Sequence, residues 1–233
     1  MATYQDIKGL KVKYLSADPS NLASGEVWYN STTGTLKLYG LAPGTVAAGG
    51  APSGNAGKTQ LGGCGTVTAG LMFGGEPTTG ATEEYNGTAW TNVNANPNTG
   101  TDMGSAGTQT SGLWIGGTGS PTSASYEYDG TNWASGGALG TGRYGLAGTG
   151  TQIAALAAGG YSPAVTTTAN VEEYDGSSWS EVNNIPTATK GITGFGIQTA
   201  AVVSGGGPPA VTATYEYDGT NWSGGGAMAT ARF

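Results

Sequence analysis

The heptapeptide Glu-Tyr-Asn-Gly-Thr-Ala-Trp at residues 84–90 decides the fold, because the chain repeats it three more times. Close copies, with Asp-Gly in place of Asn-Gly, stand at 127–133, 173–179 and 216–222. The tryptophans that end the four copies are 43, 46 and 43 residues apart. Repetition at a near-constant period of this length is typical of one supersecondary unit copied along the chain. We therefore expect four structural repeats.

Each copy predicts a β-hairpin, because Asn-Gly and Asp-Gly accept the positive φ angles of a type I′ turn. Tyr85 and Trp90 flank the first turn at an odd separation, which places both side chains on one face of the hairpin and Glu84 on the other. An isolated hairpin is only marginally stable, so these aromatic faces need a partner surface. We expect the hairpins to stack through a scaffold of Tyr85, Trp90, Tyr128, Trp133, Tyr174, Trp179, Tyr217 and Trp222.

A short apolar run that ends in a pair of glycines precedes each heptapeptide, as 71–73 precedes Gly74-Gly75. We expect this run to be a buried strand and the segment before it, such as 105–110, to be another. The repeat then holds about four short strands, which is the size of one propeller blade. The glycines of the four pairs are Gly74, Gly75, Gly116, Gly117, Gly159, Gly160, Gly205 and Gly206.

The order of these features, an apolar run, a glycine pair, then a tyrosine and a tryptophan, resembles the kelch repeat. The resemblance covers residues 58–233. It implies an all-β fold, a kelch-like β-propeller of four repeats that is either complete or part of a larger propeller. The chain departs from the kelch pattern in one respect, because a basic residue clearly follows the tryptophan strand only at Arg143 and Arg232.

The repeats differ in length at one place only. The first three tryptophans each lie 27 residues before the second glycine of the next pair. The tyrosine, in contrast, lies 10, 11, 14 or 11 residues after the second glycine of its own pair. In a four-stranded meander this variable loop shares a face with the blade-to-blade connections, and loops of this kind often bind ligands. Simple tolerance of insertions explains the variation equally well. The candidate binding residues are Pro77, Pro121, Tyr161, Pro163 and Pro208.

The sequence of residues 1–40 does not contain the repeat, and its pattern predicts a small unit of β-strands. Segments 25–30 and 34–39 are expected to form a β-hairpin, with a weaker strand within 7–15. Residues 41–57 are rich in Gly, Ala and Pro, as linkers are. A unit of about 40 residues lacks the core to be stable alone, so we expect it to oligomerise or to dock on another protein.

The segment 21–37, Asn-Leu-Ala-Ser-Gly-Glu-Val-Trp-Tyr-Asn-Ser-Thr-Thr-Gly-Thr-Leu-Lys, resembles N-terminal segments of fibre-like virion proteins of tailed phages, especially marine phages and cyanophages. The resemblance implies that residues 1–40 anchor the chain on a virus particle. The candidate anchor residues are Trp28, Tyr29, Leu36 and Leu38.

Composition excludes several classes of function. The chain has eight basic and fifteen acidic residues, so it lacks the basic surface that binds nucleic acid. It has one cysteine and no histidine, so it cannot form a Cys/His metal cluster. We predict no catalytic, metal or cofactor-binding residue, because a copper oxidase needs His ligands and a sialidase needs clustered Arg. Neither a signal peptide nor a membrane-spanning run stands out, so we expect synthesis in a host cytoplasm and no membrane insertion.

Taken together, these features predict a phage virion structural protein, a tail fibre or surface appendage. Residues 1–40 would dock on other virion proteins, and the propeller, residues 58–233, would bind a host-surface glycan or protein. We also expect a homo-oligomer. The alternatives are a capsid decoration protein and a non-viral kelch-type adaptor.

Overall fold

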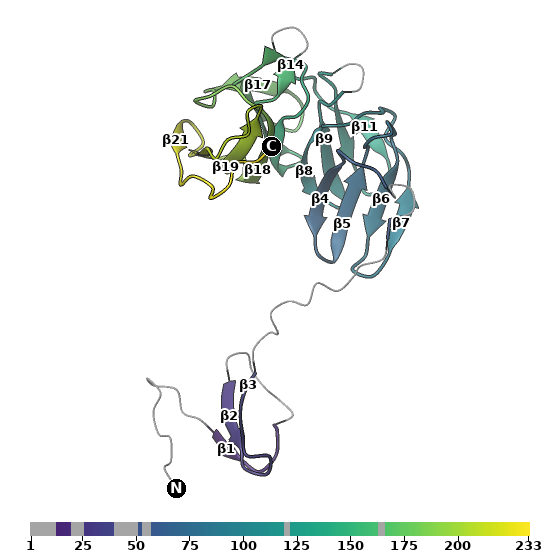
Figure 1. Ribbon diagram of the computed structural model, residues 1–233. Helices are drawn as coiled ribbons and strands as arrows, with labels where there is room; N and C mark the ends of the chain where they lie inside the picture. Colours follow the sequence, from purple (N-terminus) through teal and green to yellow (C-terminus); the bar gives the residue numbers. More distant parts are fainter. Residues whose placement is uncertain (1–12, 20–25, 40–50, 53–56, 119–121, 163–165) are drawn as a thin grey trace. The chain divides into compact units, whose positions relative to one another are not determined.

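The computed structural model describes residues 13–19, 26–39, 51–52, 57–118, 122–162 and 166–233, whose regular structure is entirely β (Figure 1). The predicted all-β class is therefore confirmed for these residues. Among them no helix is long and apolar enough to cross a membrane. The chain divides into two compact units, Met1–Ala48 and Gly49–Phe233, which we describe separately.

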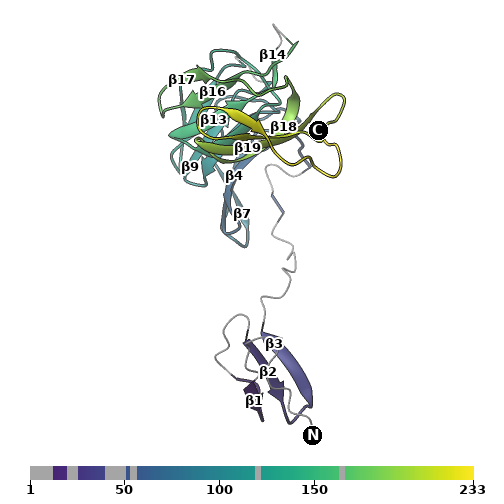
Figure 2. The same ribbon diagram turned by 90° about the vertical axis from the view of Figure 1, so that its left-hand side faces the viewer.

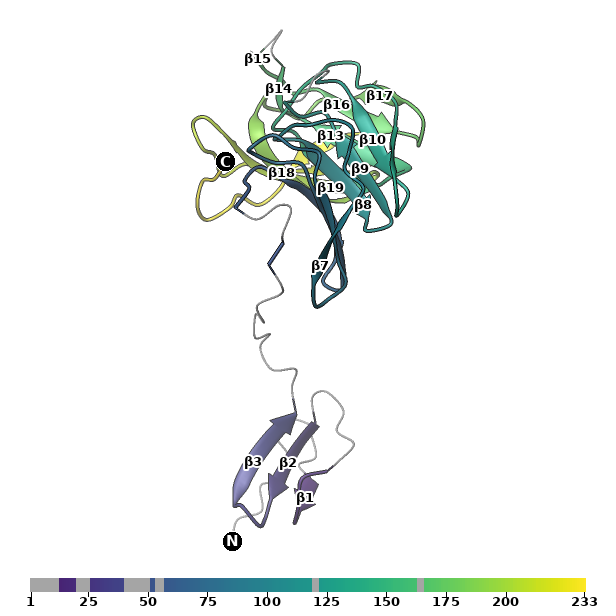
Figure 3. The same ribbon diagram turned by 90° about the vertical axis from the view of Figure 1, so that its right-hand side faces the viewer.

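The N-terminal unit holds a three-stranded sheet, seen in Figure 3, of β1 (Lys13–Leu15), β2 (Glu26–Asn30) and β3 (Thr35–Tyr39). The strand β2 pairs with β1 in parallel and with β3 antiparallel. Asn30 closes the turn between β2 and β3, because its Oδ1 accepts hydrogen bonds from the backbone N–H groups of Thr32 and Thr33. The predicted hairpin is thus present, and the last three residues of the segment 7–15 form β1.

The C-terminal unit consists of four antiparallel sheets of four strands each, which we call blades 1 to 4 (Figures 1 and 3). A small ladder, β14 (Tyr161–Ser162) with β15 (Thr166–Thr167), lies in the loop between the second and third strands of blade 3. Blade 1 contains β4 (Gly62–Thr66), β5 (Ala69–Phe73), β6 (Thr82–Tyr85) and β7 (Trp90–Val93). Blade 2 contains β8 (Gly104–Thr108), β9 (Ser111–Ile115), β10 (Ser125–Tyr128) and β11 (Trp133–Ser135). Blade 3 contains β12 (Ala147–Thr151), β13 (Ala154–Ala158), β16 (Val171–Tyr174) and β17 (Trp179–Val182). Blade 4 contains β18 (Lys190–Ile197), β19 (Ala200–Gly207), β20 (Thr214–Tyr217) and β21 (Trp222–Gly224).

The blades are arranged about their first strands. The strand β4 packs beside β8, β8 beside β12, and β12 beside β18, whereas no comparable packing joins β18 back to β4 among the described strands. These first strands are rich in glycine, which lets neighbouring backbones approach closely. A Cβ on Gly148 of β12, for example, would stand 2.5 Å from the backbone nitrogen of Ser105 in β8. Four strands per repeat in a radial, propeller-like order confirm the predicted architecture.

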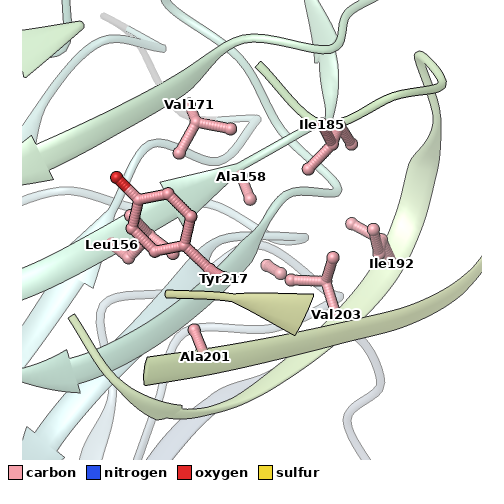
Figure 4. Close-up of a cluster of buried hydrophobic side chains, with 9 residues drawn as sticks. Leu156, Ala158, Val171, Ile185, Ile192, Ala201, Val203 and Tyr217 are labelled. Atoms are coloured by element: carbon pink, nitrogen blue, oxygen red, sulfur yellow. The ribbon is translucent and has the colours of Figure 1, made fainter. Parts of the chain in front are cut away.

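The hydrophobic core lies between the blades. Figure 4 shows the contact of blades 3 and 4, where Leu156 and Val171 of blade 3 meet Val203 and Tyr217 of blade 4. Figure 2 shows the strands β13 and β19 that carry two of these side chains. Equivalent clusters join blade 1 to blade 2 and blade 2 to blade 3. Each blade is therefore stabilised chiefly by burying apolar area against its neighbours.

The turn that joins the last two strands of a blade differs from the predicted type I′ turn. Trp90 pairs directly with Tyr85, so four residues form the loop, and of the turn residues Asn86 and Gly87 only the glycine has a positive φ, +91°. The Asn86 side chain closes the loop, because Oδ1 accepts hydrogen bonds from the N–H groups of Thr88 and Ala89. The side chain of Asn or Asp thus replaces a backbone turn. The other blades repeat this with Asp129, Asp175 and Asp218.

A candidate binding face

The glycine pairs attach the variable loops to the blade-to-blade connections. In blade 2 the N–H of Gly117 donates a hydrogen bond of 3.0 Å to the carbonyl oxygen of Arg143, and Gly116 has a φ of +63° that a glycine adopts at little cost. A side chain on Gly116 would also meet the Arg143 carbonyl oxygen at 2.4 Å. The matching bonds in the other blades run from Gly75 to Gly100, Gly160 to Thr189 and Gly206 to Arg232. The loops and connections therefore lie on one face, which we call the connection face.

Four backbone positions, each just before or at the start of the first strand of a blade, follow one another across the connection face. The N–H of Asp102 donates to the carbonyl oxygen of Gln60, that of Gly145 to Asp102, and that of Gly191 to Gly145. All four have a positive φ, between +54° and +63°. Gln60 and Asp102 hold this left-handed conformation with a side chain, which is uncommon. Non-glycine residues in such conformations tend to gather at functional sites.

The side chains of this row form a polar group. The amide Nε2 of Gln60 donates a hydrogen bond of 3.0 Å to Oδ2 of Asp102, and the Thr101 hydroxyl lies 3.5 Å from the same oxygen. Burial raises the pKa of the Asp102 carboxyl, and the Thr101 hydroxyl, the charge of Lys190 and the Gln60 amide each oppose that rise. Asp102 is therefore a partly buried acceptor beside a cation.

Two tyrosines stand next to this group. Tyr144, from the connection between blades 2 and 3, pairs with Tyr161, from the longest variable loop, through two backbone hydrogen bonds. Their ring centroids are 5.2 Å apart, and Nζ of Lys190 lies 4.8 Å from the centroid of the Tyr161 ring. A cation over an aromatic face at this distance is a favourable contact. We call Gln60, Asp102, Tyr144, Tyr161 and Lys190 the axial cluster.

A buried ion pair fixes the backbone near the axial cluster. The guanidinium of Arg143, the residue before Tyr144, lies 2.5 Å from Oε1 of Glu172, and both side chains are almost completely inaccessible. Arg143 also donates to the carbonyl oxygens of Thr141 and Ala157, so most of its donors are satisfied. Breaking such a pair would leave an uncompensated buried charge, which is energetically costly. The pair therefore keeps the connection that carries Arg143 in one conformation.

The chemistry of the axial cluster suits recognition of a polar, uncharged ligand. Tyrosine rings offer an apolar surface with a hydrogen-bonding hydroxyl, while carboxylate, amide and ammonium groups supply both acceptors and donors. These are the groups that a carbohydrate, with apolar ring faces and many hydroxyls, can contact. Within the described ranges, no group of three or more His, Cys, Asp or Glu side chains is placed to hold a metal ion.

The structure places the predicted site residues in different surroundings. Of the candidate loop residues, Pro77 and Pro208 are exposed on the connection face, and Tyr161 belongs to the axial cluster. Pro121 and Pro163 lie outside the described residues. The sequence did not point to Gln60, Asp102, Tyr144 or Lys190. Their one shared signal is their position just before or at the start of the first strand of a blade, where the four repeats differ in sequence.

The scaffold and anchor residues are placed as follows. In each blade the tyrosine and tryptophan of the heptapeptide face one another, with ring centroids 4.8 to 5.1 Å apart. Trp28 is buried in the N-terminal sheet and donates to Oδ1 of Asp18 over 3.0 Å, while Tyr29 stacks on the exposed Tyr14. Leu36 and Leu38 are described by their backbone in β3.

No family model matches the sequence, and no curated protein matches it. Among solved structures the chain is similar to the structure of YjhT, with a TM-score of 0.65 and 14% sequence identity. The match covers 77% of this chain and 68% of that chain, which has a propeller-type fold. The large unit is a four-bladed β-propeller arrangement. A likeness at this identity concerns the fold alone, so function rests on the geometry of the site.

Proposed function

We propose that this chain is a non-catalytic binding protein of a phage particle, a tail fibre or surface appendage with kelch-type repeats. In this proposal residues 1–40 dock on other virion proteins, and the propeller presents the connection face to a host surface. The observation that carries the binding function is the axial cluster, which gathers two tyrosines, a carboxylate, an amide and an ammonium group from different blades.

The exposed aromatic residues of the N-terminal sheet support the proposal that residues 1–40 dock on another protein. The N-terminal sheet is small, yet it buries Trp28 and exposes Tyr14, which is 70% accessible and stacked on Tyr29. An exposed aromatic pair on a three-stranded sheet is a suitable contact for another protein, because aromatic residues are enriched at interfaces. This feature, with the resemblance of segment 21–37 to phage fibre proteins, favours attachment to a particle over a free adaptor protein.

Surface glycans are the proposed ligand class. Tyr144 and Tyr161 provide ring faces for stacking on a sugar, and Asp102, Gln60 and Lys190 provide hydrogen bonds around them. The acidic surface of the chain, with a net charge of −7, favours neutral glycans over strongly anionic ones.

The binding half is tested with the full chain on an array of bacterial surface glycans. We expect saturable binding to a subset of neutral glycans, and at least about a tenfold loss of affinity in Tyr161→Ala, because stacking and the Lys190 contact are both removed. Ile153→Ser is the matched control, since Ile153 is exposed in the turn between β12 and β13, away from the connection face. Equal losses in both variants, or no binding to any glycan, would argue against the axial cluster as a glycan site.

A further inference from the structure

The turn between the last two strands of blade 1 differs from the other three such turns in one functional group. Asn86 stands where blades 2, 3 and 4 have Asp129, Asp175 and Asp218. The glycine that follows has a φ between +89° and +92° in all four turns. The sequence contains no other asparagine that a glycine follows. Blade 1 alone therefore carries an amide in a turn that elsewhere holds a carboxylate.

The amide of Asn86 is held by its own loop as an electrophile. Its Oδ1 accepts hydrogen bonds from the N–H groups of Thr88, at 3.0 Å, and Ala89, at 2.9 Å. Two N–H groups on one carbonyl oxygen draw electron density from the carbonyl carbon. They also stabilise the negative charge that the oxygen gains when a nucleophile attacks that carbon. The loop thus forms an oxyanion hole around an asparagine side chain.

The nucleophile that faces this electrophile is the next backbone nitrogen of the chain. Among the described residues no group accepts a hydrogen bond from the N–H of Gly87, so its nitrogen is not held away from the side chain. Gly87 has no Cβ that could hinder the approach of this nitrogen to Cγ of Asn86. Asn86 is exposed, so water can reach the amide and ammonia can leave. Four consecutive residues therefore supply every group that an intramolecular attack needs.

We propose that Asn86 loses its amide spontaneously in the folded protein and becomes an aspartate, so that the chain comes to carry a carboxylate in all four turns. The nitrogen of Gly87 attacks Cγ of Asn86 and gives up its proton as the N–Cγ bond forms. The Cγ–Nδ2 bond breaks, and the Nδ2 group leaves with that proton as ammonia. One water molecule then opens the cyclic imide, adding its hydroxyl group to a ring carbonyl carbon and returning a proton to the Gly87 nitrogen.

The same two N–H groups decide which carbonyl carbon the water attacks. Attack at Cγ, whose oxygen they bind, restores the normal backbone and leaves an aspartate. Attack at the backbone carbonyl carbon would leave an isoaspartate, in which the main chain runs through the side chain and is longer by one carbon. The longer chain does not fit this loop, because the direct pairing of Tyr85 with Trp90 fixes its two ends. Aspartate is therefore the main product.

The other blades show that a carboxylate suits this loop. In blade 3 the N–H of Ser178 is the first of the loop groups that lower the pKa of Asp175 to about 2. Loop N–H groups also lower the pKa of Asp129 and of Asp218. A lowered pKa means that the loop binds the charged form more strongly than the neutral form. Conversion of Asn86 accordingly replaces a neutral acceptor by a stronger, charged one, and it lowers the net charge of −7 by one unit.

Mass spectrometry of the full, folded chain tests the proposal. A freshly purified sample is kept at mildly alkaline pH, and portions taken at intervals are digested with pepsin in acid, where the reaction is slow. The peptide that contains Asn86 should gain about 1 Da as the amide is replaced by a carboxyl group. Isoaspartate in the same peptide is measured with an isoaspartyl methyltransferase and should be the minor product. Asn86→Asp is the blank, because its peptide should gain no mass.

Two variants separate the effect of the loop from the ordinary reactivity of an Asn-Gly pair. Asp129→Asn places the pair in the equivalent loop of blade 2, where two backbone N–H groups already hold the side chain. The introduced asparagine should revert to aspartate at the rate of Asn86, within about twofold. Thr33→Asn places the pair in the exposed turn of the N-terminal sheet, where no described backbone N–H donates to the Thr33 side chain. This site should react about threefold or more slowly and give mainly isoaspartate.

Four results would overturn the proposal. The first three are a peptide that keeps its mass in the folded chain, a product that is mainly isoaspartate, and a Thr33→Asn site that matches Asn86 in rate and product. The fourth is a faster reaction of the chain in urea, where the loop is lost and we expect slower conversion with mainly isoaspartate. Circular dichroism confirms that each variant is folded before the rates are compared.

Discussion

The hydroxyl of Tyr128 donates a hydrogen bond of 2.9 Å to Oε1 of Glu84, which joins the heptapeptide of blade 2 to that of blade 1. The tyrosine is completely buried at this contact, whereas the glutamate is partly exposed. The same pair of positions meets at both later contacts. One repeated residue pair therefore specifies how each blade is placed on the one before it.

Replacing Tyr128 with Phe should lower the free energy of unfolding by about 1–2 kcal/mol, because a hydrogen bond to a charged group is lost at a buried position. Tyr85→Phe is the matched control and should change the value by less than about 0.5 kcal/mol, since the Tyr85 hydroxyl has no partner among the described residues. Urea denaturation followed by tryptophan fluorescence measures both. Equal effects would show that the Tyr128–Glu84 bond does not hold the blades together.

Stability should fall at alkaline pH through the same tyrosines. Burial, and then the hydrogen bond to Glu127 or Glu173, raises the pKa of Tyr174 and of Tyr217 to about 12, from an ordinary value of about 10. Because the pKa is higher in the folded than in the unfolded state, these tyrosines contribute their full stabilisation of the fold below pH 10. That stabilisation is lost as the pH rises toward 12. Denaturation midpoints measured between pH 8 and pH 12 should be level at first and then decline. A level midpoint throughout would contradict these buried, neutral phenols.

The buried ion pair predicts a large loss of stability from a single substitution. Arg143→Met removes the charge that faces Glu172 and should lower the free energy of unfolding by about 3–5 kcal/mol, because the carboxylate is left buried and unpaired. Arg232→Met is the control, since Arg232 occupies the matching position in the segment that follows blade 4 but is exposed, and it should lower the free energy of unfolding by less than about 0.5 kcal/mol. Thermal unfolding by calorimetry compares the two variants. Similar melting temperatures for both would refute the role given to Arg143.

The aromatic scaffold gives a further comparison within one chain. Trp133 packs edge-on against Phe73 of blade 1, with ring centroids 5.1 Å apart, and donates to the Thr82 hydroxyl. Trp133→Ala should therefore lower the free energy of unfolding by about 3–5 kcal/mol. Trp90→Ala should lower it clearly less, because no blade of the described residues packs against Trp90 as blade 1 packs against Trp133, and Trp90 stacks only on Tyr85 among the described rings. Proteolytic susceptibility of the two variants would rank them, and the reverse order would contradict stacking between blades.

Much of this fold follows from local rules in the sequence. Tyr85 and Trp90 are an odd number of residues apart, so their side chains lie on one face of the hairpin whether the loop has two residues or four. The prediction that they share a face was therefore correct even though the predicted turn type was not. The turn itself was predicted wrongly, because the Asn86 side chain competes with the backbone for the loop N–H groups. The close approach of β8 and β12, where a Cβ on Gly148 would stand 2.5 Å from the backbone nitrogen of Ser105, was not predicted from the sequence.

The candidate site could be predicted only in part. Tyr161 stood out because its loop is the longest of the four, but Asp102 and Lys190 come from connections that share no motif. Their proximity depends on the order of blades around the axis, which brings together residues 88 positions apart. The Arg143–Glu172 pair was missed for a similar reason, since nothing local marks two charged residues as partners in a buried contact.

The proposed function requires that this chain is part of a virus particle and is held there by its N-terminal unit. The most direct test is to purify particles from infected host cells and to locate the tagged chain by immunogold electron microscopy. We expect label on a tail or surface appendage for the full chain and no incorporation of a variant lacking residues 1–40. Particles free of the full chain, or particles that incorporate the shortened chain equally well, would contradict it.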